Sequence, residues 1–287
     1  MQIELGALYV VSTPIGNLED LTLRALRILR EVDCIAAEDT RHTSQLLRHF
    51  GITTPLISLH EHNERDRLAQ IATLLEQGKR VALVSDAGTP LISDPGFPLV
   101  RELRRRKLPV IPVPGPSSVL AALAVAGLPT DRFVFEGFLP AKRAARQERL
   151  QMLAREERTL VFFEASHRIT ETVADLALAM GQERPAVIAR ELTKRFEEVH
   201  SAPLHELGLW LAADPHRTRG EFVIVVHGAP PATLVDTLEN RRFLKALLAE
   251  LPVSRAVVVA AQWTRLPKKP LYELALTLRE QQTIENS

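Results

Sequence analysis

The sequence alternates between short apolar runs and amphipathic segments, and this alternation constrains the fold more than any other feature. Runs with the length of buried strands occur at residues 8–12, 34–37, 56–59, 81–85 and 110–113. The segments between them, such as residues 21–32 and 66–77, carry apolar side chains at helical spacing. Short strands separated by helices indicate crossover connections and a largely parallel sheet. We therefore predict an α/β fold.

A proline-rich stretch divides this pattern. Pro112, Pro114 and Pro116 interrupt it, and we place a domain boundary here, so that the first α/β domain spans residues 1–113. A second alternating block spans residues 114–229, with strands expected at residues 133–135, 159–163, 186–189 and 222–226, and an edge hairpin strand at residues 197–200. Two α/β domains are thus predicted.

The end of the chain differs in character. A short linker rich in Gly and Pro, residues 227–233, precedes a helix–turn–helix pattern that we predict to form a module over residues 234–287. Within it, residues 253–263 are ambiguous, because Val257–Val259 favours a strand. Ser254 as an N-cap and Pro267 after the run favour a helix, which is the interpretation we adopt.

The composition limits the compartment and the class of partner. Lys plus Arg number 36 and Asp plus Glu 35, so a globally basic nucleic-acid binder is excluded, although local basic patches are not. The single cysteine, Cys34, excludes an intrachain disulfide and a Cys-based zinc site, which favours a reducing, cytoplasmic location. Residues 1–8 lack a basic leader, and the longest apolar stretch, residues 119–128, is half the ~20 residues of a membrane helix.

Three turns follow predicted strands directly and are candidates for ligand binding: Thr13–Leu18, Ser85–Gly96 and Pro114–Ser118. Open α/β sheets bind ligands at the carboxyl ends of their strands. Ser85–Gly96 is the strongest candidate, since two Asp, two Gly and two Pro in twelve residues suit a ligand with ammonium or ribose hydroxyl groups. The alternatives are ordinary surface turns and, for Ser117 or Ser118, a helix N-cap. None of the three matches a dinucleotide fingerprint or a P-loop.

Taken together, these motifs resemble a known family. Ala36–Thr43 (AAEDTRHT) and Ser85–Gly96 (SDAGTPLISDPG) are long and specific, and shorter matching stretches extend the resemblance over essentially the whole chain. The chain is similar to the tetrapyrrole methylases, a class of S-adenosylmethionine (SAM) methyltransferases without a G-x-G-x-G loop, and within them to the branch that methylates ribosomal RNA. It departs from the pattern at Ser12 and Ser166, which affects turn rigidity only.

The resemblance implies a substrate, a cofactor and an assembly. The expected reaction is SAM-dependent methylation of a ribose 2′-hydroxyl of a decoding-region cytidine in 16S ribosomal RNA of the small subunit, by a homodimeric enzyme. SAM is expected in a cleft between the two α/β domains. The residues expected to bind it are Pro14, Gly16, Asp86, Ala87, Gly88, Thr89, Pro90, Leu91, Ile92, Ser117, Phe163, Leu192 and Phe222.

A ribose hydroxyl is a weak acid, so a general base or a nearby cation would assist its methylation. The catalytic candidates in the matching motifs are Lys194, Glu191, Asp39, Glu38 and Arg41. We favour Lys194 beside Glu191, because a lysine held by a carboxylate can stabilise a developing alkoxide. The alternative is that these residues form structural ion pairs or contact phosphates.

Basic clusters supply candidates for RNA contacts: Lys142, Arg143, Arg146, His167, Arg168, Arg255, Lys268 and Lys269. Arg and Lys are the usual phosphate donors. The alternatives are a solvated charged face and, for His167 and Arg168, a cap at a helix start. Aromatic residues make up only 5% of the chain, so a broad base-stacking surface is not expected.

Two further interpretations stay open at this point. His60 and His62 suggest a metal, but they are two residues apart rather than four, no third ligand is evident and methyl transfer from SAM needs none, so we predict no metal site. The chain could instead methylate a small tetrapyrrole-like molecule, for which the basic tail would have no use. It could also be a non-catalytic RNA-binding assembly factor, against which the intact Ser85–Gly96 loop argues.

Overall fold

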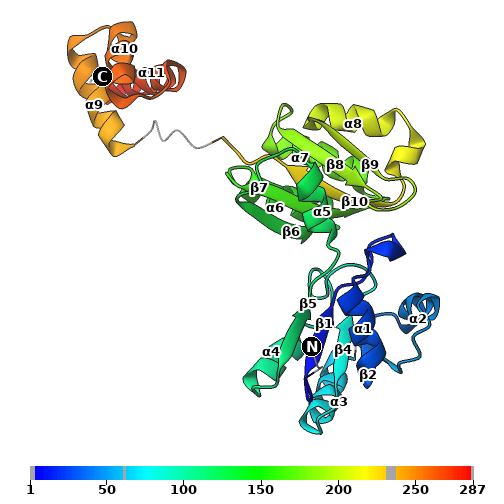
Figure 1. Ribbon diagram of the computed structural model, residues 1–287. Coiled ribbons are helices and arrows are strands. Elements are labelled where there is room, and N and C mark those ends of the chain that lie inside the picture. The colour runs from blue at the N-terminus through cyan, green and yellow to red at the C-terminus, as the bar shows by residue number, and fades with distance from the viewer. Residues whose placement is uncertain (1–3, 61–62, 231–236, 286–287) are drawn as a thin grey trace. The chain divides into compact units, whose positions relative to one another are not determined.

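The computed structural model describes residues 4–60, 63–230 and 237–285 and divides the chain into two compact units, Met1–Ala229 and Pro230–Ser287 (Figure 1). The larger unit contains two five-stranded sheets, and the described part of the smaller one, residues 237–285, contains helices and no strand. In the parts of the chain that the structure describes, no helix is long and apolar enough to cross a membrane. The predicted α/β fold with a C-terminal helical segment is confirmed.

The first sheet is entirely parallel, with the strand order β3-β2-β4-β1-β5. Its strands are β1 (Leu8–Val11), β2 (Cys34–Ala37), β3 (Leu56–Ser58), β4 (Val81–Val84) and β5 (Val110–Val113). Helices α1 (Leu23–Glu31) and α2 (Thr40–His49) pack on one face, and α3 (Glu64–Glu76) and α4 (Phe97–Arg105) on the other. Because both faces are covered, the central strands are apolar throughout, as is usual in parallel sheets.

The second sheet has the order β6-β7-β10-β8-β9 and is mainly antiparallel. Its strands are β6 (Phe133–Phe138), β7 (Thr159–Ala165), β8 (Pro185–Arg190), β9 (Glu198–Pro203) and β10 (Glu221–Val226). Among its neighbouring pairs, only β6 and β7 are parallel. The prediction of a largely parallel sheet therefore holds for the first sheet alone. Successive strands joined by a helix still run in the same direction, and the direction reverses where β9, the predicted edge strand, pairs with β8 as a hairpin.

The helices of the second sheet are unevenly distributed. Three of them, α6 (Arg143–Leu153), α7 (Ile169–Met180) and α8 (Leu204–Ala212), cover one face. The other face is covered by α5 (Ser118–Val125), together with Ile15 from the loop that follows β1. Ile15 thus joins the loops of the first sheet to the core of the second.

The C-terminal unit is a three-helix module formed by α9 (Leu238–Glu250), α10 (Val253–Thr264) and α11 (Lys268–Glu285). The residues at its core include Leu244, Val257 and Leu271. The ambiguous segment at 253–263 is helical, as predicted. Part of the predicted linker, residues 231–233, lies outside the described residues.

Candidate active site

The three turns singled out in the sequence lie together at the carboxyl edge of the first sheet. They follow β4, β1 and β5, which are neighbours in that order. The backbones of Thr13 and Gly88 exchange hydrogen bonds of 2.8 and 3.0 Å. The Thr89 hydroxyl lies 3.0 Å from Ser12 Oγ and donates to the carbonyl of Pro116 at 3.1 Å. Thr89 therefore links all three turns.

A cavity of about 460 Å³ opens beside these turns. Its apolar lining includes Ile15, Phe163, Leu192 and Phe222, and its carboxylates are Glu38, Asp86, Asp94, Glu164 and Glu221. The apolar residues come mainly from the second sheet. Glu38, Asp86 and Asp94 lie in loops of the first sheet, and Glu164 and Glu221 lie on β7 and β10 of the second. An apolar pocket of several hundred Å³ with a few converging polar groups is typical of a small-molecule site.

The two aspartates of the Ser85–Gly96 loop differ in role. Asp86 Oδ1 accepts the backbone N–H of Asp39 at 3.0 Å and so joins the loops after β4 and β2. Burial raises the pKa of Asp94, the nearby charge of Asp86 raises it further, and a hydrogen bond from Ser85 opposes the shift. A cavity carboxyl with a raised pKa is stabilised in its ionised form by a bound cation.

The other residues predicted to bind the cofactor do not all line the main cavity. Ala87 lines the main cavity, Ser117 lines a second cavity of about 300 Å³, and Pro14 and Gly16 line a third of about 350 Å³. Gly88, Thr89, Pro90, Leu91 and Ile92 line none of these three cavities. Ser117 is the N-cap residue of α5, but its side chain makes no capping hydrogen bond.

Lys194 forms an ion-pair cluster at the edge of the cavity. Its Nζ donates to Glu191 Oε1 and to Glu221 Oε2, both at 2.9 Å, and Glu221 lines the cavity. Burial lowers the pKa of Lys194, but the hydrogen bonds to the two carboxylates outweigh it, and the net shift is upward. Burial raises the pKa of Glu191, yet the bonds from Lys194 and the Glu221 N–H lower it overall. Both groups are therefore charged at neutral pH.

The segment after β2 contains the other catalytic candidates. Glu38 lines the main cavity. Asp39 caps α2 through the backbone N–H of Arg41 and binds the Arg41 guanidinium at 2.8 Å. The hydrogen bonds from Arg41 hold the pKa of Asp39 at about 2, which makes Asp39 a poor proton acceptor near pH 7. Asp39 and Arg41 thus bind each other, and neither lines the cavity.

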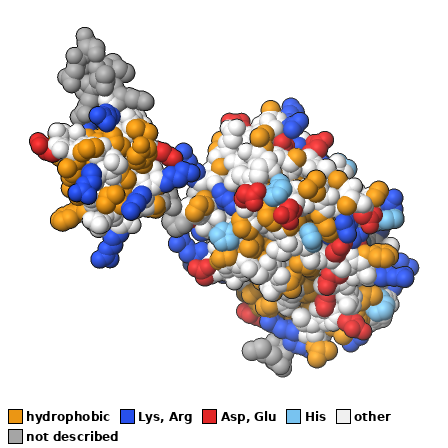
Figure 2. All heavy atoms as spheres, turned by 90° about the horizontal axis from the view of Figure 1, so that it is seen from above, with side chains coloured by type: hydrophobic (Ala, Val, Ile, Leu, Met, Phe, Trp, Pro, Cys, Tyr) orange, Lys and Arg blue, Asp and Glu red, His pale blue; other side chains and the backbone are white. Residues whose placement is uncertain are grey.

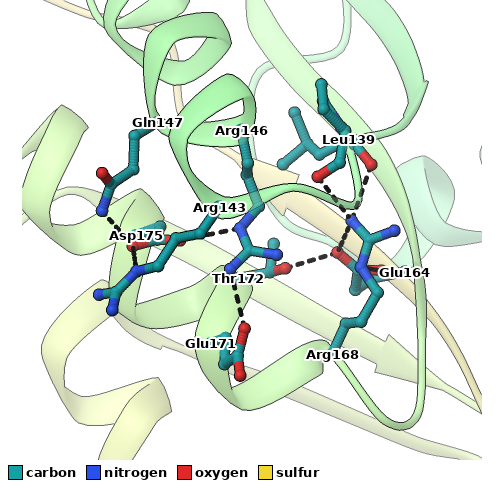
Figure 3. A network of polar contacts seen from close by, with 10 residues as sticks. Leu139, Arg143, Arg146, Gln147, Glu164, Arg168, Glu171, Thr172 and Asp175 are labelled. Carbon is teal, nitrogen blue, oxygen red and sulfur yellow. Dashed lines mark hydrogen bonds and ion pairs between the residues drawn. The ribbon is translucent and has the colours of Figure 1, made fainter.

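Arg143 and Arg146 of α6 form a polar network with the carboxylates of α7 (Figure 3). Arg146 has a side chain only 1% exposed and donates to Asp175 at 2.8 Å and to Glu171 at 3.0 Å. The prediction that Arg146 contacts RNA is wrong. A guanidinium that is buried and held by two carboxylates has no access to a phosphate. Arg143 also binds Asp175, but its side chain is 67% exposed.

Arg168 is likewise held inside the protein. Its Nη2 donates to the carbonyls of Leu139 and Pro140 at 2.7 and 3.3 Å and to Glu164 at 3.3 Å. Its side chain is 16% exposed, so the predicted phosphate contact is replaced by bonds to the protein. His167 and Lys142 are exposed.

The three predicted cations of the C-terminal unit, Arg255, Lys268 and Lys269, are exposed. Figure 2 shows Lys and Arg side chains distributed over the visible face of this unit, among exposed hydrophobic side chains. Lys268 and Lys269 begin α11.

No group of three or more potential metal ligands occurs among the described residues. His60 has its Nε2 3.2 Å from the Asn63 amide. His62 lies outside the described residues.

Comparison with known proteins decides the family. Residues 7–208 match the family model of the tetrapyrrole (corrin/porphyrin) methylases, and residues 235–279 match the RsmI C-terminal HTH domain. The chain belongs to the tetrapyrrole methylase family. It is accordingly a SAM-dependent methyltransferase.

Several curated relatives of this methylase, from different bacteria, carry the name "Ribosomal RNA small subunit methyltransferase I". The protein from Pseudomonas aeruginosa is 54% identical, with 94% of this chain and 97% of the relative covered. The protein from Escherichia coli O157:H7 is 48% identical, with 94% and 95% covered.

Solved structures agree on the fold of this methylase. A cobalt precorrin-4 methyltransferase superposes with a TM-score of 0.58 at 18% identity, covering 77% of this chain and 95% of the other. A Thermus thermophilus uroporphyrin-III C-methyltransferase complexed with S-adenosyl homocysteine gives 0.53 at 22% identity, covering 77% and 97%.

The main cavity fits the methylase cofactor. The carboxylates in its lining match an ammonium and a sulfonium group, and the apolar side chains of Phe163 and Leu192 match an adenine ring. Gly88 has a positive φ of 80°, and a Cβ there would approach Ile15 Cγ2 at 3.3 Å. Gly88 therefore allows the loop after β4 to come close to Ile15 at the cavity wall.

Sequence reasoning missed several cavity residues, including Asp94, Phe138 and Glu221. Asp94 lies in the Ser85–Gly96 loop. The presence of a second aspartate, Asp86, in this loop was the sequence feature that could have indicated it. Glu221 directly precedes a predicted strand, and nothing in the sequence indicated that it would meet Lys194.

Proposed function

We propose that this methylase transfers the methyl group of SAM to a ribose 2′-hydroxyl of a decoding-region cytidine in 16S ribosomal RNA of the small subunit. The observation that carries the proposal is the near-complete coverage of relatives with this substrate class in their name. The cavity supports the proposal, because it has the size of a cofactor site and carries at its edge the ion pairs of Lys194 with Glu191 and Glu221.

The residues proposed to hold the cofactor are those around the main cavity. Asp86 and Asp94 would meet its positively charged groups, and Phe163, Leu192 and Phe222 would pack on its adenosine part. Thr89 would act indirectly, by fixing the three turns relative to one another. When bound, SAM supplies a methyl group on a positively charged sulfur.

Lys194 is the proposed catalytic residue. Its upward-shifted pKa keeps it protonated at neutral pH, so it serves as a cation rather than a base. A fixed ammonium would stabilise the negative charge that develops on the ribose oxygen as it takes the methyl group and its proton passes to water. Glu191 and Glu221 would orient Lys194 Nζ, and Glu38 lines the same cavity.

Exposed basic residues are proposed to contact the RNA backbone. On the larger unit these are Lys142, Arg143 and His167, and on the C-terminal unit Arg255, Lys268 and Lys269. Phosphate contacts position RNA without reading its sequence. We further propose a homodimer in the cytoplasm, which sedimentation analysis of the purified protein and fractionation of the source cells would test.

The direct test is transfer of labelled methyl from SAM to purified small subunits that lack the modification. We expect label in subunits with the wild type and at least a 100-fold lower rate with Asp86→Ala, since Asp86 both lines the cavity and joins two loops. Normal activity of Asp86→Ala would overturn the cofactor assignment.

A truncated chain separates the alternatives. Removing residues 230–287, which form a compact unit of their own, should lower activity on subunits if this unit contacts RNA. Unchanged activity on subunits would mean that this unit makes no RNA contact that the reaction needs. Methylation of a tetrapyrrole but not of subunits would favour a small-molecule substrate. Binding of subunits without any binding of SAM would favour an assembly factor.

A further inference from the structure

An exposed aromatic ring at the cavity is not explained by the cofactor residues. Phe138 lines the main cavity, yet it is 55% exposed, whereas Phe222 of the same cavity is 3% exposed. Leaving so much of a phenyl ring in water is unfavourable. We propose that Phe138 is a stacking platform for a nucleobase of the RNA substrate; this rests on the function proposed above.

A β-bulge aims this ring. In a regular strand, residues three apart point to opposite faces. The register of β6 against β7 shifts between Phe135 and Gly137. As a result the rings of Phe135 and Phe138 both contact Phe163, with centroid distances of 4.9 and 5.5 Å. Bulges often redirect a side chain beside an active site.

Gly137 makes the bulge possible and brings it to the cavity. Its φ is +65°, and a Cβ at this position would lie 3.0 Å from Ser93 Oγ, another cavity residue. Glycine is favoured here because it adopts the left-handed region and leaves room for Ser93. The bulge therefore brings Gly137 to Ser93 of the Ser85–Gly96 loop, and Phe138 and Ser93 line the same cavity.

Arg168 holds the backbone that follows the ring (Figure 3). It donates to the carbonyls of Leu139 and Pro140, and its other partner, Glu164, is fixed by the Thr172 hydroxyl at 2.5 Å. The Glu164 side chain is fully buried. Arg168 is thus a positioning residue for Phe138.

Basic residues that closely follow Phe138 in the sequence favour RNA as the occupant over the cofactor. Lys142 and Arg143 follow Phe138 by four and five residues and are exposed. An aromatic ring next to cations is the usual combination for an unpaired base and its phosphate. The adenine of the cofactor, which offers the same flat surface, is the alternative that the experiment must distinguish.

The test compares Phe138→Leu with Phe138→Tyr and with Phe133→Leu, a control at the other end of the same strand. We expect Phe138→Leu to lower kcat/KM for unmodified small subunits roughly tenfold, the usual size of one base-stacking contact. The Kd of S-adenosyl homocysteine, measured by calorimetry, should stay within about twofold. Phe138→Tyr and Phe133→Leu should resemble the wild type.

Two results would overturn the proposal. A rise in the Kd of S-adenosyl homocysteine equal to the loss in kcat/KM would assign Phe138 to the cofactor. An effect of Phe138→Leu no larger than that of Phe133→Leu would show that the ring contacts neither ligand. If the wild type methylates no subunits, the function proposed above has failed, and binding of a single-stranded oligoribonucleotide by the same variants still decides whether Phe138 stacks.

Arg168→Met provides a second test. If Arg168 only positions the ring, this variant should lower kcat/KM for subunits in the same direction and leave the Kd of S-adenosyl homocysteine unchanged. The double variant Arg168→Met/Phe138→Leu should then be little worse than Phe138→Leu alone. Additive losses would contradict a role that acts through Phe138.

Discussion

Two ion-pair networks of the larger unit differ in how much of each is exposed to solvent. Each contains a basic residue that the sequence predicted to act on a ligand, Arg146 in one and Lys194 in the other. In one, Arg146 and Asp175 lie between α6 and α7, each with a side chain 1% exposed. In the other, Lys194 lies at the edge of the cavity with its side chain 27% exposed and binds Glu221, whose side chain is 79% exposed. The first network is surrounded by protein, and the second faces a ligand cavity.

The difference shows how to separate structural from functional cations. A buried guanidinium must have its hydrogen bonds satisfied by the protein, so Arg146 is fully used by the fold. A partly exposed ammonium between two carboxylates keeps its charge and remains accessible to a substrate oxygen. Burial, rather than the presence of a basic residue in a motif, decides the role.

Breaking the buried network should have the largest effect. Asp175→Asn leaves the charge of Arg146 without its nearest carboxylate, and we expect a loss of about 3 kcal/mol in the free energy of unfolding. Denaturant unfolding measures it. The Kd of S-adenosyl homocysteine for the folded variant should not change, because the network lies outside the cavity.

A matched double variant checks the cause. Arg146→Met/Asp175→Leu removes both charges and should recover most of the stability that Asp175→Asn loses, because a buried apolar pair needs no partners. A double variant as unstable as the single one would mean that hydrogen bonds to other residues, and not an uncompensated charge, dominate.

Removing the cation at the cavity should lower the rate of catalysis and leave the stability of the protein nearly unchanged. Lys194→Met is expected to lower kcat about 100-fold, as loss of a charge-stabilising donor does. The free energy of unfolding should change by less than about 1 kcal/mol, because the pairs are partly exposed. If kcat is unchanged while stability falls, Lys194 is structural and the comparison fails.

The smallest expected effect concerns Asp94 and pH. Because the pKa of Asp94 is raised above its ordinary value of 3.8 in the folded protein, its ionisation favours the unfolded chain as pH rises. Asp94→Asn should therefore raise the melting temperature at pH 7, and the gain should vanish below about pH 4. A gain that is the same at both pH values would have a cause other than ionisation.

The first sheet could be predicted from sequence because its signals are local. Apolar runs and helical spacing predicted its strands to within a residue or two. Gly78, with a φ of +80°, follows the end of α3, a position that glycine favours at a helix C-terminus. The strand order of the second sheet could not be derived this way. The pairing of β7 with β10 joins segments about sixty residues apart, and no local pattern encodes it.

The candidate site, like the fold, could be predicted from the sequence only in part. Loops after parallel strands converge because of sheet geometry, so the meeting of Thr13, Thr89 and Pro116 followed from the fold class. The burial of Arg146 did not, because it depends on Asp175 from another helix. The orientation of Phe138 depends on a single bulge, which a sequence pattern does not reveal.

The central claim is that this methylase modifies one ribose in the small subunit. The most direct measurement is to map labelled methyl in 16S ribosomal RNA after reaction with unmodified small subunits. Nuclease digestion followed by alkaline hydrolysis would give the position, since a 2′-O-methyl group protects the adjacent phosphodiester. The account predicts one protected cytidine in the decoding region. Label on a base, or spread over many nucleotides, would contradict it.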